Sequence, residues 1–238
     1  MLYAIGYDYI EILNIFKKYS NKIKYMDYKN IFKLIYGIIF KGEIIINGLN
    51  SGEKLEKIIN QYCEEKQITN INQINFPLLI PAIDIYTGDI CFFTNKIYYI
   101  KNDNIKFINN ANISKIIRAS CSYPLVFSPC KYNNTELIDG GIAENIPWKG
   151  LKQIGADKVI SVIFKKKNSK KCCSNVIQVI NNSLDIMSKE LLEYEIIGSD
   201  YLIEMETEEI GLLDMSKIDY MYNLGYETAK KQIRKFKL

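Results

Sequence analysis

Apolar positions along the chain recur with two different periods, one helical and one strand-like. Downstream of Ser51, apolar side chains repeat at the i, i+3, i+4, i+7 spacing of one helix face, and Ser51 is the expected N-cap of this helix. The side chains concerned are Leu55, Ile58, Ile59 and Tyr62. In contrast, residues 78–85 form an unbroken apolar, partly β-branched run, which is typical of a buried strand.

Along the rest of the sequence, the same patterns predict helices and strands that alternate. We expect further helices over residues 8–19, 28–40, 113–119, 176–195 and 218–236. Another short helix is expected with Asn145 as its cap, Pro147 in its first turn and Gly155 at its end. Further strands are expected over residues 90–94, 97–100, 136–138, 158–164 and 201–205, with a hairpin turn at 87–89. This alternation predicts an α/β layered fold with a mainly parallel central sheet flanked by helices, in a single domain over residues 1–238.

Histidine is absent from the sequence, which narrows the chemistry available to it. Without imidazole, the chain cannot build a Ser-His-Asp triad, a Cys-His dyad or a His-ligated zinc site. The net charge of +4, from 31 Lys and Arg against 27 Asp and Glu, is too small to indicate nucleic-acid binding. No segment reaches the length of about 20 apolar residues that a transmembrane helix needs. We therefore expect a soluble protein or one peripheral to a membrane.

Six cysteines are present without a C-x-x-C pair, so a zinc ribbon is not expected. They are Cys63, Cys91, Cys121, Cys130, Cys172 and Cys173. No secretory signal pattern opens the sequence, since Asp8 closely follows Met1. Free thiols and a cytoplasmic location are the expectation.

The strongest candidate for chemistry is the stretch Asp139-Gly140-Gly141, directly after the strand expected at 136–138. A carboxylate at a strand end lies at the edge where α/β sheets hold their ligands, and glycines permit a turn that side chains would obstruct. The same three residues are also a common turn sequence, so both readings stay open on these residues alone.

The surrounding motifs resemble those of the patatin-like phospholipase family. Residues 118–129 read R-A-S-C-S-Y-P-L-V-F-S-P, residues 139–147 read D-G-G-I-A-E-N-I-P, and residues 155–162 read G-A-D-K-V-I-S-V. They match the family's R-A-S-x-S-x-P-x-x-F-x-P, D-G-G-x-x-x-N-x-P and G-A-D-x-V-I-x-V in order. Residues 81–88 resemble its strand ending in D-x-x-T-G, and residues 215–229 resemble its closing helix. The resemblance covers nearly the whole chain.

This resemblance implies a lipid acyl hydrolase that works with a Ser-Asp dyad and no cofactor or metal. Asp139 would be the base of the dyad, and Gly140, Gly141, Asn145 and Pro147 would support it within the motif. The implied substrate is a phospholipid or another acyl lipid. Such a dyad agrees with the absence of histidine.

The family's glycine-rich oxyanion loop and G-x-S-x-G nucleophile motif do not occur in these residues. Residues 1–8 resemble the end of the helix that follows the nucleophile in the family. We therefore expect a chain truncated at its N-terminus, lacking its first strands, inactive alone and poorly soluble because strand edges are left unpaired. The alternative is a non-catalytic remnant that binds lipid or a partner.

Four further segments each carry a structural and a functional reading. Ser120 and Ser122 are expected to be structural, while Cys121 could replace the serine only if its thiol were activated. The lysines of residues 165–171 suit a solvated loop or a contact with anionic lipid. Residues 25–40 suit a core helix or a membrane-facing cap. The adjacent Cys172 and Cys173 suit a surface loop or a lipidation site.

Overall fold

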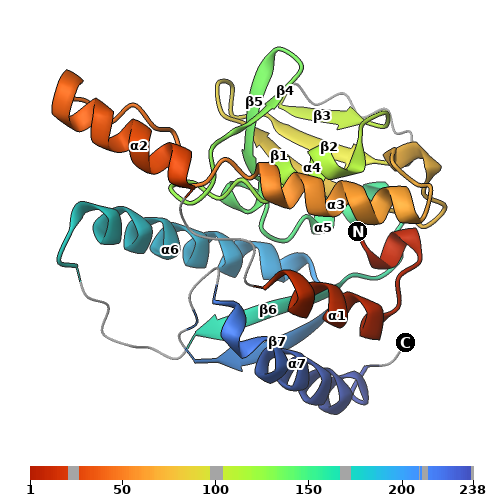
Figure 1. Ribbon diagram of the computed structural model, residues 1–238. Coiled ribbons are helices and arrows are strands. Elements are labelled where there is room, and N and C mark those ends of the chain that lie inside the picture. Colours follow the sequence, from red (N-terminus) through yellow and green to blue (C-terminus); the bar gives the residue numbers. More distant parts are fainter. Residues whose placement is uncertain (21–26, 97–103, 167–172, 209, 211–213, 237–238) are drawn as a thin grey trace. The chain divides into compact units, whose positions relative to one another are not determined.

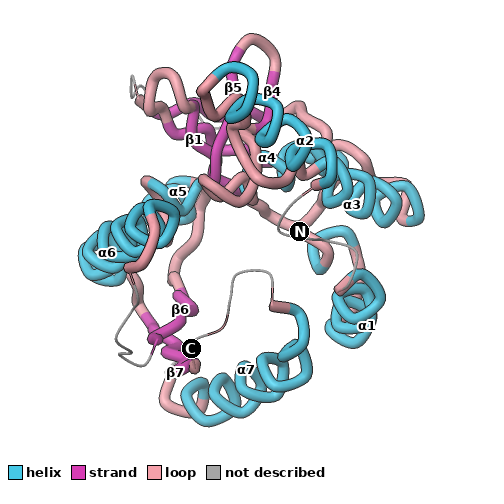
Figure 2. Tube along the Cα trace, turned by 60° about the vertical axis from the view of Figure 1, so that its left-hand side comes forward, coloured by secondary structure: helices cyan, strands magenta, loops and turns pink. Residues whose placement is uncertain are grey.

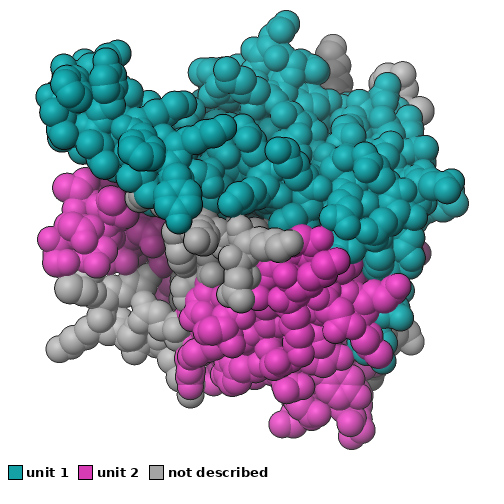
Figure 3. Space-filling model, in the orientation of Figure 1, with its two compact units in different colours: residues 1–9, 22–145 teal, residues 10–21, 146–238 magenta. Residues whose placement is uncertain are grey.

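The computed structural model describes residues 1–20, 27–96, 104–166, 173–208, 210 and 214–236 (Figure 1). It divides into two compact units, which are described separately below. Unit 1 comprises residues 1–9 and 22–145, and unit 2 comprises residues 10–21 and 146–238 (Figure 3). The strand expected over residues 97–100 lies outside the described residues, as do Cys172 and most of the lysine cluster.

Unit 1 is built on a five-stranded sheet in the order β3-β2-β1-β5-β4. Its strands are β1 (Leu79–Asp84), β2 (Ile90–Thr94), β3 (Ile105–Ile108), β4 (Cys130–Tyr132) and β5 (Thr135–Asp139). Among these described strands, β2 and β3 are parallel, whereas β1 pairs antiparallel with both β2 and β5, and β5 pairs antiparallel with β4.

The prediction of a mainly parallel sheet is therefore wrong for unit 1. The reason lies in two tight connections, since a parallel pair needs a crossover of about a dozen residues or more. Gly88 takes a left-handed φ of +76° in the turn that reverses β1 into β2, and Asn133 takes a φ of +50° between β4 and β5. The hairpin expected at 87–89 is confirmed.

The helices of unit 1 cover the sheet in layers. α4 (Ile113–Ser120) packs on β1 and β5, and α3 (Glu53–Glu65) packs on α4 (Figure 1). The side chains at the centre are fully buried, among them Phe92, Phe93, Ile113, Ile116 and Leu137. α2 (Tyr28–Tyr36) continues into a π-helical turn at Gly37–Lys41, and single 3-10 turns occupy Tyr3–Ile5, Ile71–Gln73 and Gly140–Ile142.

Unit 2 contains a parallel pair, β6 (Ile160–Lys166) and β7 (Tyr201–Thr207), joined through α6 (Val176–Glu195). α7 (Ile218–Ile233) packs on β7, as Figure 2 shows. The unit also includes residues 10–19 of α1 (Tyr9–Tyr19), α5 (Trp148–Gln153) and 3-10 turns at Ile196–Gly198 and Met215–Lys217. The parallel arrangement that the sequence predicts is confirmed for this pair. The α/β class with sheet strands flanked by helices is confirmed as well.

Two helix starts differ from expectation. The N-cap of α3 is Gly52 rather than Ser51, whose hydroxyl and backbone N–H both donate to Asp27 Oδ2 at 2.8 Å. The N-cap of α5 is Pro147, so Asn145 does not cap this helix. Gly155 follows the end of α5 with a left-handed φ of +96°, as expected for a helix C-terminus.

Candidate functional site

Asp139 is the last residue of β5, and its backbone is held from two sides. It lies opposite Ala82 in the register between β5 and β1. Its N–H donates to the carbonyl oxygen of Ser122 at 3.2 Å. The structure therefore places Asp139 at a strand end, as the sequence predicts. Ala82 and Ser122, which flank its backbone, both belong to unit 1.

The two glycines that follow Asp139 have different structural roles. A Cβ on Gly140 would stand 2.6 Å from the carbonyl oxygen of Pro81, so only glycine fits against β1 at this position. A Cβ on Gly141 would stand 3.2 Å from Asp139 Oδ1 and 3.4 Å from Asn145 Oδ1. The turn therefore brings the Asn145 amide and the Asp139 carboxylate to the same glycine.

The Asp139 carboxylate is half-buried and has one backbone hydrogen bond. Its Oδ1 accepts from the N–H of Gly141 at 2.8 Å. Burial raises the pKa of Asp139 above its ordinary value, and the Gly141 hydrogen bond opposes that rise without cancelling it. A carboxyl group with a raised pKa at a strand end is suited to accept and return a proton.

Pro147, the remaining predicted motif residue, lies in unit 2. Its carbonyl accepts from the N–H of Leu151 at 3.0 Å in the first turn of α5. Beside it, the N–H of Ile146 donates to Oε2 of the buried Glu195 at 2.9 Å. The sequence analysis did not single out Glu195, and a lone carboxylate near the end of an amphipathic helix gives no signal that could have done so.

Arg118 organises the segment that precedes the candidate site. It is 3% exposed, and its guanidinium donates to the carbonyl oxygens of Ser51 and Ser128, each at 2.6 Å. It also donates to the hydroxyl of Ser122, which in turn donates to the Arg118 carbonyl at 2.8 Å. Ser122 is fully buried, so the structural reading of this serine is confirmed.

Cys121 lies within electrostatic range of the candidate base. The packing around its sulfur, followed by the negative charge of Asp139, raises the pKa of the Cys121 thiol to about 11, although part of the residue is exposed. Arg118 and the N-terminal amine of Met1 act in the opposite direction and are outweighed. This environment therefore does not activate the Cys121 thiol.

A family model for patatin-like phospholipases matches residues 2–152. The chain belongs to the patatin-like phospholipase family. The matched range contains the Arg118 segment, the Asp139-Gly140-Gly141 turn, Asn145 and Pro147.

Two viral proteins are similar to this patatin-like chain. A probable lipid hydrolase, 463L, of Invertebrate iridescent virus 6 is 28% identical over 97% of the chain and 74% of its own length. An uncharacterised protein, R571, of Acanthamoeba polyphaga mimivirus is 26% identical over 79% of the chain and 66% of its own length.

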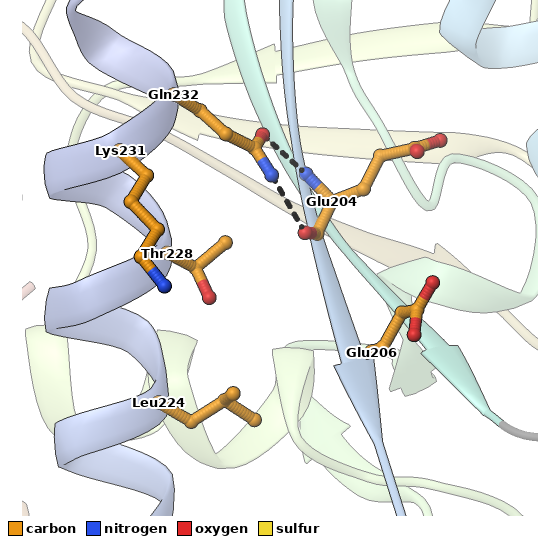
Figure 4. Close-up of a pocket in the computed structure, with 6 residues that line it drawn as sticks. All are labelled: Glu204, Glu206, Leu224, Thr228, Lys231 and Gln232. Atoms are coloured by element: carbon orange, nitrogen blue, oxygen red, sulfur yellow. Dashed lines mark hydrogen bonds between the residues drawn. The ribbon is translucent and has the colours of Figure 1, made fainter.

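Three further observations concern possible binding sites and membrane spans among the described residues. A hollow of about 270 Å³ in unit 2 lies between β7 and α7, and none of the predicted site residues lines it (Figure 4). Within the described ranges, no group of three or more Cys, Asp or Glu side chains is placed to hold a metal ion. The helices of the described part are all too short or too polar to cross a membrane.

Proposed function

We propose that this chain carries the acid-base half of a lipid acyl hydrolase that uses a Ser-Asp dyad, with Asp139 as its base. The observation that carries the proposal is the Asp139 carboxylate at the end of β5, desolvated, with a raised pKa and held by the Gly141 N–H. The family match and the 463L relative support lipid hydrolysis, and the absence of histidine from these residues favours a dyad over a triad. The proposed substrate is an acyl ester of a phospholipid or a related lipid.

In the proposed reaction, a serine hydroxyl attacks the ester carbonyl carbon while its proton passes to the Asp139 carboxylate. The tetrahedral intermediate collapses, the bond to the alcohol oxygen breaks, and Asp139 returns the proton to that oxygen. Water then attacks the acyl-serine, again with Asp139 as base, and releases the fatty acid and the free serine. Backbone N–H groups would stabilise the oxyanion in both steps.

Asn145 and Glu195 are proposed as positioning residues. The amide oxygen of Asn145 lies close to Gly141, the residue that hydrogen-bonds the base. Glu195 holds the N–H of Ile146, the next residue along the chain, within unit 2. Both would therefore act on the geometry of the D-G-G-x-x-x-N-x-P segment rather than on the substrate.

These 238 residues contain no G-x-S-x-G motif, so the serine of the proposed dyad would have to come from another segment. We propose that the chain is inactive by itself and gains activity when a segment with this motif is joined to it. The N-terminal amine lies in unit 1, within electrostatic range of Cys121, which in turn lies within range of Asp139.

The second candidate, which also fits a chain without the G-x-S-x-G motif, is a non-catalytic protein that binds lipid or a partner. A protein of this kind would keep the fold without using Asp139. The location proposed for either candidate is the cytoplasm, peripheral to a membrane.

The test is ester hydrolysis by the chain extended with the coding sequence upstream of Met1. Activity that appears on extension and falls by about 10³-fold or more in Asp139→Asn, as expected for loss of a dyad member, supports the dyad. The matched control is Glu190→Gln, which removes the same charge, because Glu190 is exposed on α6 and lies outside the family motifs quoted above. Full activity in Asp139→Asn, or an upstream sequence without a nucleophile motif, would favour the binding candidate.

A further inference from the structure

One element of unit 1 is exposed in spite of its apolar composition. We define the apolar arm as residues 28–45, which comprise α2, the π-helical turn and the segment that returns from it. Eight large apolar side chains of the arm are between 48% and 73% exposed: Tyr28, Phe32, Ile35, Tyr36, Ile38, Ile39, Phe40 and Ile44. The expectation of a core helix is therefore wrong for the described residues of this segment; Tyr25 and Met26 lie outside them.

The arm projects from unit 1, at the upper left of Figures 1 and 3. Its attachment is a set of hydrogen bonds at the base. The N–H of Asp27 donates to the Leu49 carbonyl at 3.0 Å, and the buried Asn30 amide donates to the Gly48 carbonyl at 2.9 Å. Asp27 in turn accepts from Ser51 at 2.8 Å, as described above.

The returning segment lies directly against the helix near the far end of the arm. The N–H of Glu43 donates to the Gly37 carbonyl at 3.2 Å, and Gly42 turns the chain with a left-handed φ of +68°. A Cβ on Gly37 would stand 2.5 Å from the Glu43 carbonyl oxygen, so glycine is needed for this close approach. The arm is thus a helix with an irregular return segment folded back against its far end.

Polar and apolar positions divide around α2. Asn30 is buried and Ile31 and Leu34 are partly buried on the inward face, whereas Tyr28 and Phe32 lie at the centre of the outward face. At 100° per residue, Lys29 and Lys33 fall along one side of this outward apolar face. Both lysines are exposed, as is Lys41 at the end of the π-helical turn.

The charge of the arm has one dominant sign. Residues 28–45 contain Lys29, Lys33 and Lys41 against one acidic residue, Glu43. Aromatic and aliphatic side chains that face outward beside lysines are the pattern of helices that lie at the interface of an anionic bilayer. There the apolar face enters the acyl region, while the lysine stems extend their ammonium groups to the headgroups.

From this geometry we infer that the apolar arm is the membrane-docking element of the chain and that its partner is an anionic lipid surface. A second copy of the chain is a poorer occupant, since docking arm against arm would bring the same lysines of two copies together. The inference deepens the proposed function, because an enzyme acting on acyl lipids must reach them at a membrane. Docking itself needs no nucleophile, so it can be tested without hydrolysis.

The experiment is vesicle flotation with the 238-residue chain, using phosphatidylcholine vesicles with and without about 30% phosphatidylserine. We expect binding to the anionic vesicles that weakens with added salt. The Phe32→Asp/Phe40→Asp variant should lose at least about tenfold in affinity, and Lys29→Glu/Lys33→Glu should lose about tenfold at low salt.

The matched charge control is Lys54→Glu/Lys57→Glu, which makes the same charge change on exposed positions of α3. Tyr86→Asp is the apolar control, because Tyr86 is 70% exposed in the turn between β1 and β2, outside the arm. Circular dichroism checks that each variant is folded. Equal losses in the controls, or no binding to anionic vesicles, would overturn the inference. A dimer that Phe32→Asp/Phe40→Asp dissociates, without vesicle binding, would assign the arm to an interface between copies instead.

Discussion

The carboxylate of Asp139 accepts a hydrogen bond from the backbone N–H of Gly141 at 2.8 Å, across a turn that begins where β5 ends. This bond favours the charged carboxylate, while burial of the same group disfavours it, and burial prevails. The folded chain therefore holds a charge that would be better solvated in the unfolded state.

The first prediction follows from that balance. Because the pKa of Asp139 is higher in the folded state than in the unfolded state, the folded state binds more protons between the two pKa values, and this group's contribution to stability falls as pH rises through them. Asp139→Asn keeps an acceptor for the Gly141 N–H and removes the charge. We expect this variant to be more stable than the parent at pH 7, with the difference shrinking towards pH 4.

Urea unfolding at both pH values measures this difference. Glu190→Gln serves as the control, since Glu190 is exposed and its replacement should change stability by less than about 0.5 kcal/mol. If Asp139→Asn destabilised the chain at pH 7, the carboxylate would have a structural role in place of the proposed catalytic one.

The second prediction compares the two glycines of the turn. Gly140→Ala would force a Cβ to 2.6 Å from the Pro81 carbonyl oxygen, and overpacking against backbone costs about 1–3 kcal/mol. Gly141→Ala places its Cβ 3.2 Å from the Asp139 carboxylate, which a small side-chain movement relieves. We therefore expect a clear fall in the thermal midpoint for Gly140→Ala and a small one for Gly141→Ala. Equal falls would mean that the turn does not sit against β1 as described.

The third prediction concerns the buried guanidinium of Arg118. Arg118→Met removes the donors to the Ser51 and Ser128 carbonyls, and each buried acceptor left without a partner costs about 1–3 kcal/mol. Arg118→Lys should recover only part of the loss, because an ammonium cannot reproduce the planar fork. Arg234→Lys is the matched control, since Arg234 is exposed at the end of α7. Chemical denaturation of the three variants tests this order, and an Arg118→Met chain as stable as the control would contradict it.

The sequence predicted the elements better than it predicted how they join. α6 and β2 begin and end at the expected residues, because long amphipathic and short β-branched patterns are local signals. The strands β3 and β4 were not predicted, and the antiparallel pairing of β5 with β1 and β4 was missed, because the α/β alternation favours parallel neighbours.

The candidate site shows the same limit. The place of Asp139 at a strand end followed from the pattern, and so did the structural reading of Ser122. The burial of Arg118 and the exposure of α2 could not be predicted from the pattern, because both depend on tertiary packing. From sequence alone, an arginine is expected at the surface and an apolar helix in the core.

The fourth prediction concerns thiol reactivity. A pKa of about 11 leaves roughly one Cys121 thiol in a thousand ionised at pH 8, so its alkylation should be slow. Cys173 is exposed and should react with iodoacetamide before Cys121 does. Mass mapping of partly labelled chain measures the order. Preferential labelling of Cys121 at neutral pH would return it to consideration as a nucleophile.

The fifth prediction concerns the open side of β6. Among the described strands, β6 pairs only with β7, and Ile160, Val162 and Phe164 are exposed on one of its faces. An apolar strand with an unpaired edge favours association, and a single inserted charge opposes it. Val162→Lys should therefore increase the yield of soluble monomer. Val179→Lys is the control, because Val179 is exposed to a similar extent, 49% against 54%, but lies on α6. Size-exclusion chromatography measures the yield of soluble monomer for the two variants. A larger increase for Val162→Lys would assign the association to β6. Equal increases would contradict this and assign it to general surface hydrophobicity.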